Sequence, residues 1–266
     1  MAFKDISLRT REGRKQTIRI IHEDNDLVVL DKPPGIPVLP DHWDPEKINL
    51  YDLLNSQLKK DSIPGIEKIW VVHRIDQDTS GLVVFAKNGE GHNLLNKAFS
   101  SGKVHKSYLA IVKGCPVDKE GRIDFALSTP RKGRVVVDPG EKKSLTEYRV
   151  IEQFSRFSIL EVYPLTGRTH QIRVHLHSIG HPLVVDPIYT HHSAFRITDL
   201  KRYARIQTEE KPALISRLTL HAMRLKLNHP ISGNALEFIA EVPKDMQGVI
   251  KALRKWDPVR ATQLDH

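Results

Sequence analysis

Residues 73–81 read HRIDQDTSG and residues 82–87 read LVVFAK, so a polar segment runs directly into an apolar one. The apolar run predicts a buried strand, and the segment before it is a loop that carries two carboxylates, Asp76 and Asp78. Catalytic groups are often presented by loops on a rigid scaffold. The same residues also form good turns, and an Asp-x-Asp pair can hold Mg²⁺. From these residues alone, catalysis, a turn and a metal site all remain open.

The composition favours a single domain with a polyanionic partner. A chain of 266 residues buries roughly three quarters of the surface that its unfolded form exposes, and no stretch resembles a linker. Its 41 Lys and Arg residues outnumber its 32 Asp and Glu residues, giving a net charge of +9, which suits nucleic acid or an acidic membrane surface. No run approaches the roughly 20 apolar residues of a membrane-spanning helix, and the start lacks a signal-like segment. We therefore expect a cytoplasmic protein with no membrane partner, in which the single cysteine, Cys115, forms no internal disulfide.

Hydrophobic periodicity and turn residues predict the order of the elements. Short strands at 18–21 and 27–30 flank a polar turn and form a hairpin. Helices are expected from about Asn49, over 94–99, over 168–179 and over 246–256. Further strands are expected at 82–86, 104–112, 134–137, 146–151, 158–163, 218–227 and 236–242. Because strands and helices mix without strict alternation, the predicted fold class is α+β.

Five short blocks occur in a fixed order along the chain. They are DKPPG at 31–35, HRIDQDTSG at 73–81, KSYLAIVKG at 106–114, PLTGRTHQIRVH at 164–175 with DPIY at 186–189, and LHA at 220–222 with HP at 229–230. Together these blocks resemble the RluA-type family of RNA pseudouridine synthases, and ordered blocks are far more specific than any single motif. The departures are small: Thr190 stands where the family usually has Gly, and Ile75 and Ile172 stand where Leu is common.

The resemblance implies an isomerase that breaks the N1–C1′ bond of a uridine, turns the base and rejoins it through C5. Only a proton is exchanged with solvent, so this reaction requires no cofactor. The resemblance assigns Asp76 as the essential carboxylate, Arg173 as the guanidinium that pairs with it, and Tyr108 as the ring that stacks on the uracil. It assigns Arg74 to the space that the extruded base leaves. Further candidates for RNA contacts are Lys106, Arg168, His170 and Gln171.

The resemblance also implies the pseudouridine synthase fold, a bent and mainly antiparallel sheet with flanking helices and a basic central cleft. We expect a basic N-terminal arm at 1–17 and a catalytic domain at 18–266. The arm is too short for a separate RNA-binding module, so recognition is expected from the catalytic domain, the arm and the basic stretch 190–217. The expected partner is ribosomal or transfer RNA, with no obligatory protein partner.

Two rival interpretations compete with this hypothesis. Six histidines lie between residues 170 and 192, and imidazole binds transition metals. Their spacing does not match a zinc protease motif, and the resemblance already accounts for His170 and His175, so no metal site is predicted. A non-catalytic RNA-binding protein on the same fold is the second alternative. The presence of Asp76, Tyr108 and Arg173 together argues against it.

Overall fold

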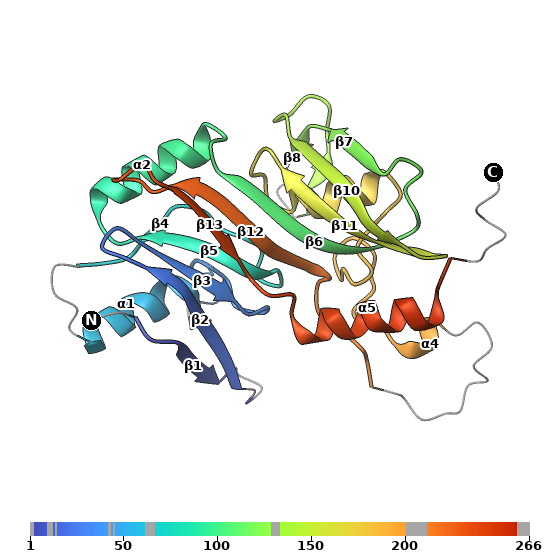
Figure 1. Ribbon diagram of the computed structural model, residues 1–266, viewed down its shortest axis with the longest axis horizontal. Coiled ribbons are helices and arrows are strands. Elements are labelled where there is room, and N and C mark those ends of the chain that lie inside the picture. The colour runs from blue at the N-terminus through green and yellow to red at the C-terminus, as the bar shows by residue number, and fades with distance from the viewer. Residues whose placement is uncertain are drawn as a thin grey trace. The chain divides into compact units, whose positions relative to one another are not determined.

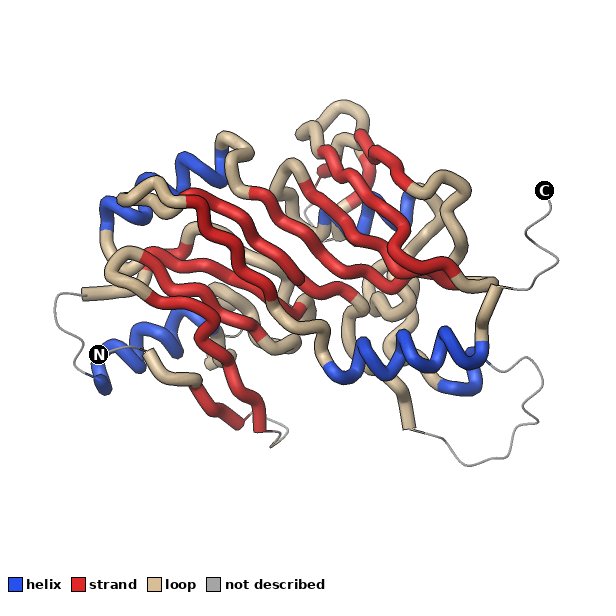
Figure 2. The backbone as a smooth tube through the Cα atoms, viewed as in Figure 1, coloured by secondary structure: helices blue, strands red, loops and turns tan. Residues whose placement is uncertain are grey.

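The structure is a computed structural model that describes residues 3–9, 13, 15–41, 44, 46–61, 67–128, 134–200 and 212–259. The chain divides into two compact units, the first of residues 1–106 with 222–240 and the second of residues 107–221 with 241–266. Each unit combines several strands with a few helices (Figure 1 and Figure 2). The chain therefore leaves the first unit after residue 106 and returns to it at residue 222.

The first unit is built on strands in the order β1, β2, β3, β5 and β12, with β4 beside β5 and β13 beside β12. Their bounds are β1 Ile6–Arg9, β2 Lys15–Glu23, β3 Leu27–Lys32, β4 Trp70–Val71, β5 Ser80–Ala86, β12 Leu220–Asn228 and β13 Ala235–Ile239. The pairs β1–β2, β2–β3, β3–β5, β4–β5 and β12–β13 are antiparallel. The predicted hairpin is confirmed as β2 and β3. The strand predicted at 82–86 is confirmed as β5, in which every residue is buried.

Both helices of the first unit begin at side-chain caps. Helix α1, Leu50–Asp61, follows Asn49, whose Oδ1 accepts a hydrogen bond from the Asp52 backbone N–H at 2.9 Å. Helix α2, Gly89–Ser100, follows Asn88, whose Oδ1 accepts from the Gly91 N–H at 2.7 Å. Such caps satisfy backbone donors that the first helical turn leaves unpaired. The helices predicted here are confirmed, and α2 contributes Leu95 to a core whose other central members are Leu27, Val29, Leu82, Val84, Leu225 and Leu227.

The second unit contains strands in the order β6, β11, β10 and β7, joined by antiparallel pairing. Their bounds are β6 His105–Lys113, β7 Glu120–Asp124, β10 Leu145–Gln153 and β11 Phe157–Pro164. A separate pair is formed by β8 Leu127–Ser128 and β9 Val136–Val137. The helices are α3 Gln171–Ser178, α4 Ile197–Leu200 and α5 Lys244–Trp256. The mixture of helices with mainly antiparallel strands confirms the predicted α+β class.

Some elements differ from their predictions for identifiable reasons. Strand β1 lies inside the segment predicted as an arm and pairs with β2, with Phe3 and Ile6 buried. Strand β7 was not predicted because its sequence, EGRID, buries only Ile123. Helix α3 begins three residues later than predicted because His170 has a left-handed backbone with φ of +52°. Part of the basic stretch 190–217 lies outside the described residues.

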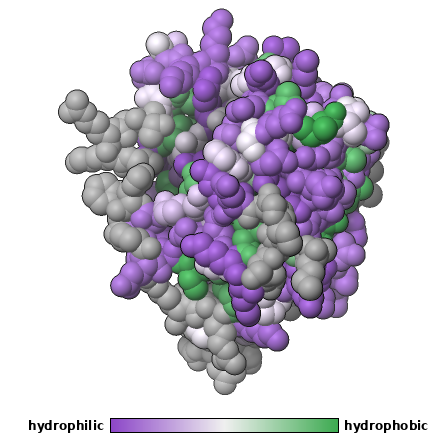
Figure 3. Space-filling view, turned by 90° about the vertical axis from the view of Figure 1, so that its left-hand side faces the viewer, coloured by the Kyte–Doolittle hydropathy of each residue, from purple (hydrophilic) through white to green (hydrophobic). Residues whose placement is uncertain are grey.

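The described surface is largely polar in the view of Figure 3, where apolar side chains form small separate areas among hydrophilic ones. Within the described ranges, every helix is too short or too polar to span a bilayer.

Candidate active site

The HRIDQDTSG loop forms a tight turn at the start of β5 in the first unit. The Thr79 N–H donates to the Asp76 carbonyl at 3.2 Å, which closes the turn. Ile75 and Thr79 are buried, Asp76 is half-buried, and Arg74 and Asp78 are exposed. The turn therefore separates the two carboxylates that the sequence alone could not rank. Asp76 lies partly within the protein, whereas Asp78 is in solvent.

Lys32 anchors this loop from inside the protein. Its side chain is 0% exposed, and its Nζ donates to the carbonyls of Pro33, Ile36 and Gln77 at 3.0, 2.8 and 2.6 Å. The Gln77 carbonyl also accepts from the Gly35 N–H at 2.9 Å. A buried ammonium requires such hydrogen bonds to offset its loss of water. The DKPPG block, which the sequence analysis gave only as part of the family resemblance, therefore fixes the path of the HRIDQDTSG loop.

Gly81 fits the start of β5 against the strand β12. Its φ is +109°, a conformation that L side chains rarely adopt, and a Cβ there would lie 2.2 Å from the Ala222 carbonyl oxygen. The loop and Ala222, the last residue of the LHA block, thus approach each other closely within the first unit. Only glycine permits both the backbone angle and this approach.

His73 ties the start of the loop to β5 as a neutral imidazole. Its Nε2 accepts a hydrogen bond from the Val84 N–H at 3.0 Å, and its ring stacks on Phe99 with centroids 4.5 Å apart. Burial, with a smaller effect of the nearby Lys106 charge, lowers the pKa of His73 to about 3. Because Nε2 is the acceptor, protonation of His73 would break the bond to β5.

We expect His73 to make the protein less stable as the pH falls below about 6.5. Below about pH 6.5 His73 is protonated in the unfolded chain, whereas in the folded chain it stays neutral down to about pH 3. The free energy of unfolding therefore decreases as the pH falls from about 6.5 to about 3. Between about pH 7 and about pH 5 the loss due to His73 is on the order of 1–2 kcal/mol. Urea unfolding of the wild type and of His73→Gln, whose amide oxygen can still accept from Val84, measures it. An equally steep decrease in the variant would contradict this assignment.

Two cationic candidates for RNA contacts lie in the first unit. Arg74 extends from the exposed side of the loop, which suits a residue that reaches a nucleotide. Lys106 lies near the start of β6 and is half-buried, and burial lowers its pKa. Lys106 and Tyr108 are two residues apart on one strand, so their side chains leave the same face of it.

The strand register of the second unit places Tyr108 on the face that α3 covers. Tyr108 pairs with Val162, and Pro164, two residues further on, pairs with Thr146. Partners in an antiparallel pair share a face, as do alternate residues of one strand. Thr146 on that face is bonded through its Oγ1 to Gln171 and His175 of α3, each at 2.9 Å. The tyrosine and the arginine-bearing helix therefore belong to one face of this sheet.

Arg173 lies in the first turn of α3 and is held by a carboxylate that the sequence analysis did not single out. Its Nε and Nη2 donate to Oδ2 and Oδ1 of Asp186, both at 2.8 Å, and both side chains are almost fully buried. The guanidinium carbon also lies 5.1 Å from the centroid of the Tyr189 ring. Asp186 and Tyr189 belong to the DPIY block. That block contributes to the family resemblance, but the resemblance assigned no role to its residues.

The residues before α3 divide into exposed and fully engaged side chains. Arg168 is exposed, and His170, half-buried, bonds through Nδ1 to the Tyr189 hydroxyl at 3.0 Å. Gln171 is buried, and its amide makes four hydrogen bonds, to Thr166, Arg168, Leu145 and Thr146. Four is the full capacity of an amide side chain. Gln171 therefore shapes the loop before α3, in contrast to the RNA contact expected from sequence.

Of the histidines that suggested a metal centre, His170 and His175 are hydrogen-bonded to other side chains of the protein, whereas His177, His191 and His192 are exposed. His175 is fully buried and bonds through Nδ1 to Thr146 and through Nε2 to the Phe125 carbonyl at 3.1 Å. Within the described residues, the group of ligand types that comes close enough for one ion is instead Asp24, Asp26 and His229. There the His229 Nδ1 accepts from the Ile231 and Ser232 N–H groups and Nε2 faces Asp24 at 3.2 Å. Because Nδ1 accepts, Nε2 is the nitrogen that donates to the Asp24 carboxylate. His229 therefore links these segments through hydrogen bonds.

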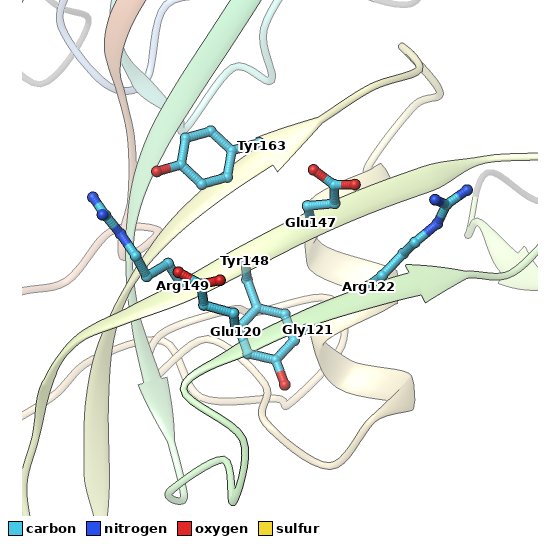
Figure 4. Close-up of a pocket in the computed structure, with 7 residues that line it drawn as sticks. All are labelled: Glu120, Gly121, Arg122, Glu147, Tyr148, Arg149 and Tyr163. Carbon is cyan, nitrogen blue, oxygen red and sulfur yellow. The ribbon is translucent and has the colours of Figure 1, made fainter.

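A surface pocket of about 490 Å³ lies on β7, β10 and β11 of the second unit (Figure 4). Its charges alternate, because Arg149 faces Glu120 and Glu147 faces Arg122 across the strand pair. Arg149 also donates to Glu161 at 2.8 Å, and Glu161 pairs with Leu109 on β6. Leu109 neighbours Tyr108, so this pocket opens on the opposite face of the sheet. Its balanced charges favour cross-strand stabilisation over phosphate binding.

Comparison with known proteins agrees with this arrangement. The model of the RNA pseudouridylate synthase family matches residues 26–178. The ribosomal large subunit pseudouridine synthase D of Zymomonas mobilis is 37% identical over 247 residues, which cover 89% of this chain and 73% of that protein. The protein of the same name from Pseudomonas aeruginosa is 36% identical, over 90% of this chain and 72% of its own. Among solved structures, human RNA pseudouridylate synthase domain containing 4 matches with a TM-score of 0.67 and 25% identity, covering 88% of this chain and 92% of that one.

The chain belongs to the RNA pseudouridylate synthase family. It is an isomerase that converts uridine in RNA to pseudouridine, as the five blocks implied. Sequence reasoning placed Asp76, Tyr108 and Arg173 on the right kinds of element: a loop before a buried strand, a strand and a helix. It gave no role to Lys32, His73 and Asp186, whose importance lies in contacts that are distant in sequence.

Proposed function

We propose that this enzyme modifies a uridine of large-subunit ribosomal RNA in the cytoplasm. The observation that carries the proposal is the similarity to ribosomal large subunit pseudouridine synthases D over about nine tenths of the chain. The net charge of +9 supports a phosphate-rich substrate. The partner is the RNA itself, with no obligatory protein partner and no cofactor. Transfer RNA is the other substrate class that the experiment below distinguishes.

In this proposal Asp76 is the catalytic carboxylate. It acts at the ribose C1′ of an extruded uridine, either as a nucleophile or by stabilising and deprotonating the sugar once the N1–C1′ bond breaks. The base then turns and C5 bonds to C1′, which releases Asp76 if that carboxylate had attacked. C5 loses its proton and N1 takes one up, so the product has the same atoms as uridine. An aspartate suits either role because it is ionised near neutral pH. Its half-buried place on a loop anchored by Lys32 supports a fixed direction of approach.

Tyr108 and Arg173 complete the proposed catalytic set. Tyr108 supplies the ring that stacks on the uracil, an interaction worth about 1–3 kcal/mol per base. Arg173 supplies the guanidinium that the family resemblance pairs with the reacting carboxylate, which would favour its ionised form. Arg74, Lys106, Arg168 and His170 are the side chains proposed to contact the RNA, as the resemblance implies.

Mapping pseudouridine in cellular RNA tests the substrate. Pseudouridine is isobaric with uridine, so it must be located by a chemical reaction specific for the product. RNA from cells with and without this gene should differ at a uridine of the large ribosomal subunit. Purified enzyme should then restore that site in large-subunit RNA transcribed in vitro. Loss of a site in transfer RNA alone would overturn the ribosomal assignment.

A further inference from the structure

The Arg173 guanidinium is held along one edge by Asp186 and on one face by the Tyr189 ring. We propose that Asp186 is a positioning residue, which sets the plane and direction of the Arg173 guanidinium for the isomerisation. This inference rests on the role that the proposed function gives to Arg173. Asp186 acts through the arginine and has no contact with the reacting atoms in this scheme.

Asp186 is itself held rigidly by the backbone around it. Its Oδ1 accepts from the N–H groups of Ile188 and Tyr189 at 3.0 and 3.1 Å, in addition to Arg173 Nη2. Its carbonyl accepts from the N–H and the hydroxyl of Thr190 at 3.1 and 2.8 Å. The carboxylate therefore cannot follow a movement of the arginine, and it defines where the arginine edge must lie.

The segment that carries Asp186 is also tied to the strand of Tyr108. The Val185 N–H donates to Thr219 Oγ1 at 3.3 Å, and that hydroxyl donates to the Ile111 carbonyl on β6 at 3.0 Å. The Val184 N–H donates to the same carbonyl at 3.0 Å. Asp186 thus gives Arg173 a fixed position relative to the strand that carries the proposed stacking ring.

The face of the guanidinium is fixed as well as its edge. The buried Tyr189 ring lies 5.1 Å from the Arg173 guanidinium carbon, and the Tyr189 hydroxyl bonds to His170 at 3.0 Å. A guanidinium has five N–H donors in one plane, of which the pair with Asp186 uses Nε and one of Nη2. With edge and face both held, the direction of the other three N–H groups is determined, and they point away from Asp186.

Replacing Asp186 by Asn tests this inference, because an amide has one acceptor oxygen and an NH₂ donor in place of the two oxygens that bind Nε and Nη2. The reaction is followed by the release of tritium from in vitro transcribed large-subunit RNA whose uridines carry tritium at C5. We expect kcat to fall by about 100-fold, as when a reacting group is displaced by about 1 Å, with KM within about twofold. In an Arg173→Lys background, which cannot form the two-point contact, Asp186→Asn should change kcat by less than about twofold.

The matched control is Asp245→Asn. Asp245 accepts from Arg217 Nε and Nη2 at 2.8 and 2.7 Å, the same two-point geometry in the same unit. This variant should unfold at a lower temperature with kcat within about twofold of the wild type. If Asp186→Asn lacks a cooperative thermal transition, Asp186→Glu, which keeps the charge but misplaces it, is assayed with the same two outcomes.

Three results would overturn the positioning role of Asp186. They are an unchanged kcat in the folded variant, an increase in KM without a decrease in kcat, and an equal decrease in kcat in the wild-type and Arg173→Lys backgrounds. These outcomes are distinct from failure of the proposed function. In that case the wild type itself would release no tritium from this RNA.

Discussion

Asp76→Asn should abolish pseudouridine formation while leaving RNA binding intact. The amide has nearly the shape of the carboxylate, but it is neutral and can neither attack C1′ nor stabilise a developing positive charge there. We expect the rate of tritium release to fall by at least about 10⁴-fold. The dissociation constant for the RNA should be unchanged or lower, because one negative charge near the phosphates has been removed.

Asp78→Asn is the matched control for this variant. Asp78 lies two residues further along the same loop and loses the same charge on substitution, but its side chain is exposed. We expect its rate to stay within about threefold of the wild type, since the exposed Asp78 is not the carboxylate that acts at C1′ in the proposed mechanism. Product from Asp76→Asn at the wild-type rate would falsify the proposed mechanism, and equal losses in both variants would remove the distinction between the two carboxylates.

Gly81→Ala should unfold the first unit or prevent it from folding. The new Cβ would lie 2.2 Å from the Ala222 carbonyl oxygen, and its nearest neighbours are all backbone atoms of Ala222. Neither strand can yield without breaking the pairing that surrounds a fully buried β5. We expect the free energy of unfolding to drop by more than about 4 kcal/mol, which is exceptional for one methyl group. Urea unfolding followed by circular dichroism measures this loss.

Gly35→Ala measures the cost of a positive φ without the steric clash that Gly81→Ala adds. Gly35 also has a positive φ, +89°, but a Cβ there meets nothing within 4 Å. Only the conformational penalty of about 1–2 kcal/mol is then expected. Similar losses at the two positions would show that the approach of Ala222 to residue 81 is not what requires glycine there.

The fold was predictable where periodicity and caps act locally. Asn49 and the leucines after it predicted α1, and the apolar run after Gly81 predicted β5, because both signals lie within one element. Strand β7 was missed because an edge strand that buries one residue leaves almost no pattern. The start of α3 was misplaced because a left-handed histidine at position 170 is a backbone property that side-chain spacing does not reveal.

The sequence predicted which residues to propose as catalytic, but not which residues hold them in place. The family blocks gave Asp76, Tyr108 and Arg173, whereas Lys32 and Asp186 act through partners 45 and 13 residues away. Gln171 looked like a polar contact residue because sequence cannot tell a satisfied amide from an exposed one. The resemblance paired Arg173 with Asp76, and its further partner Asp186 was not predicted because that contact depends on the folded arrangement of the segment after α3.

The anchoring of the loop by Lys32 has a consequence for how this enzyme can change over evolutionary time. The Lys32 ammonium donates to main-chain carbonyls in this anchor, and one of them is the carbonyl of Gln77. The side chain at position 77 is therefore irrelevant to the anchor, and drift there would leave the trajectory of the neighbouring carboxylate untouched.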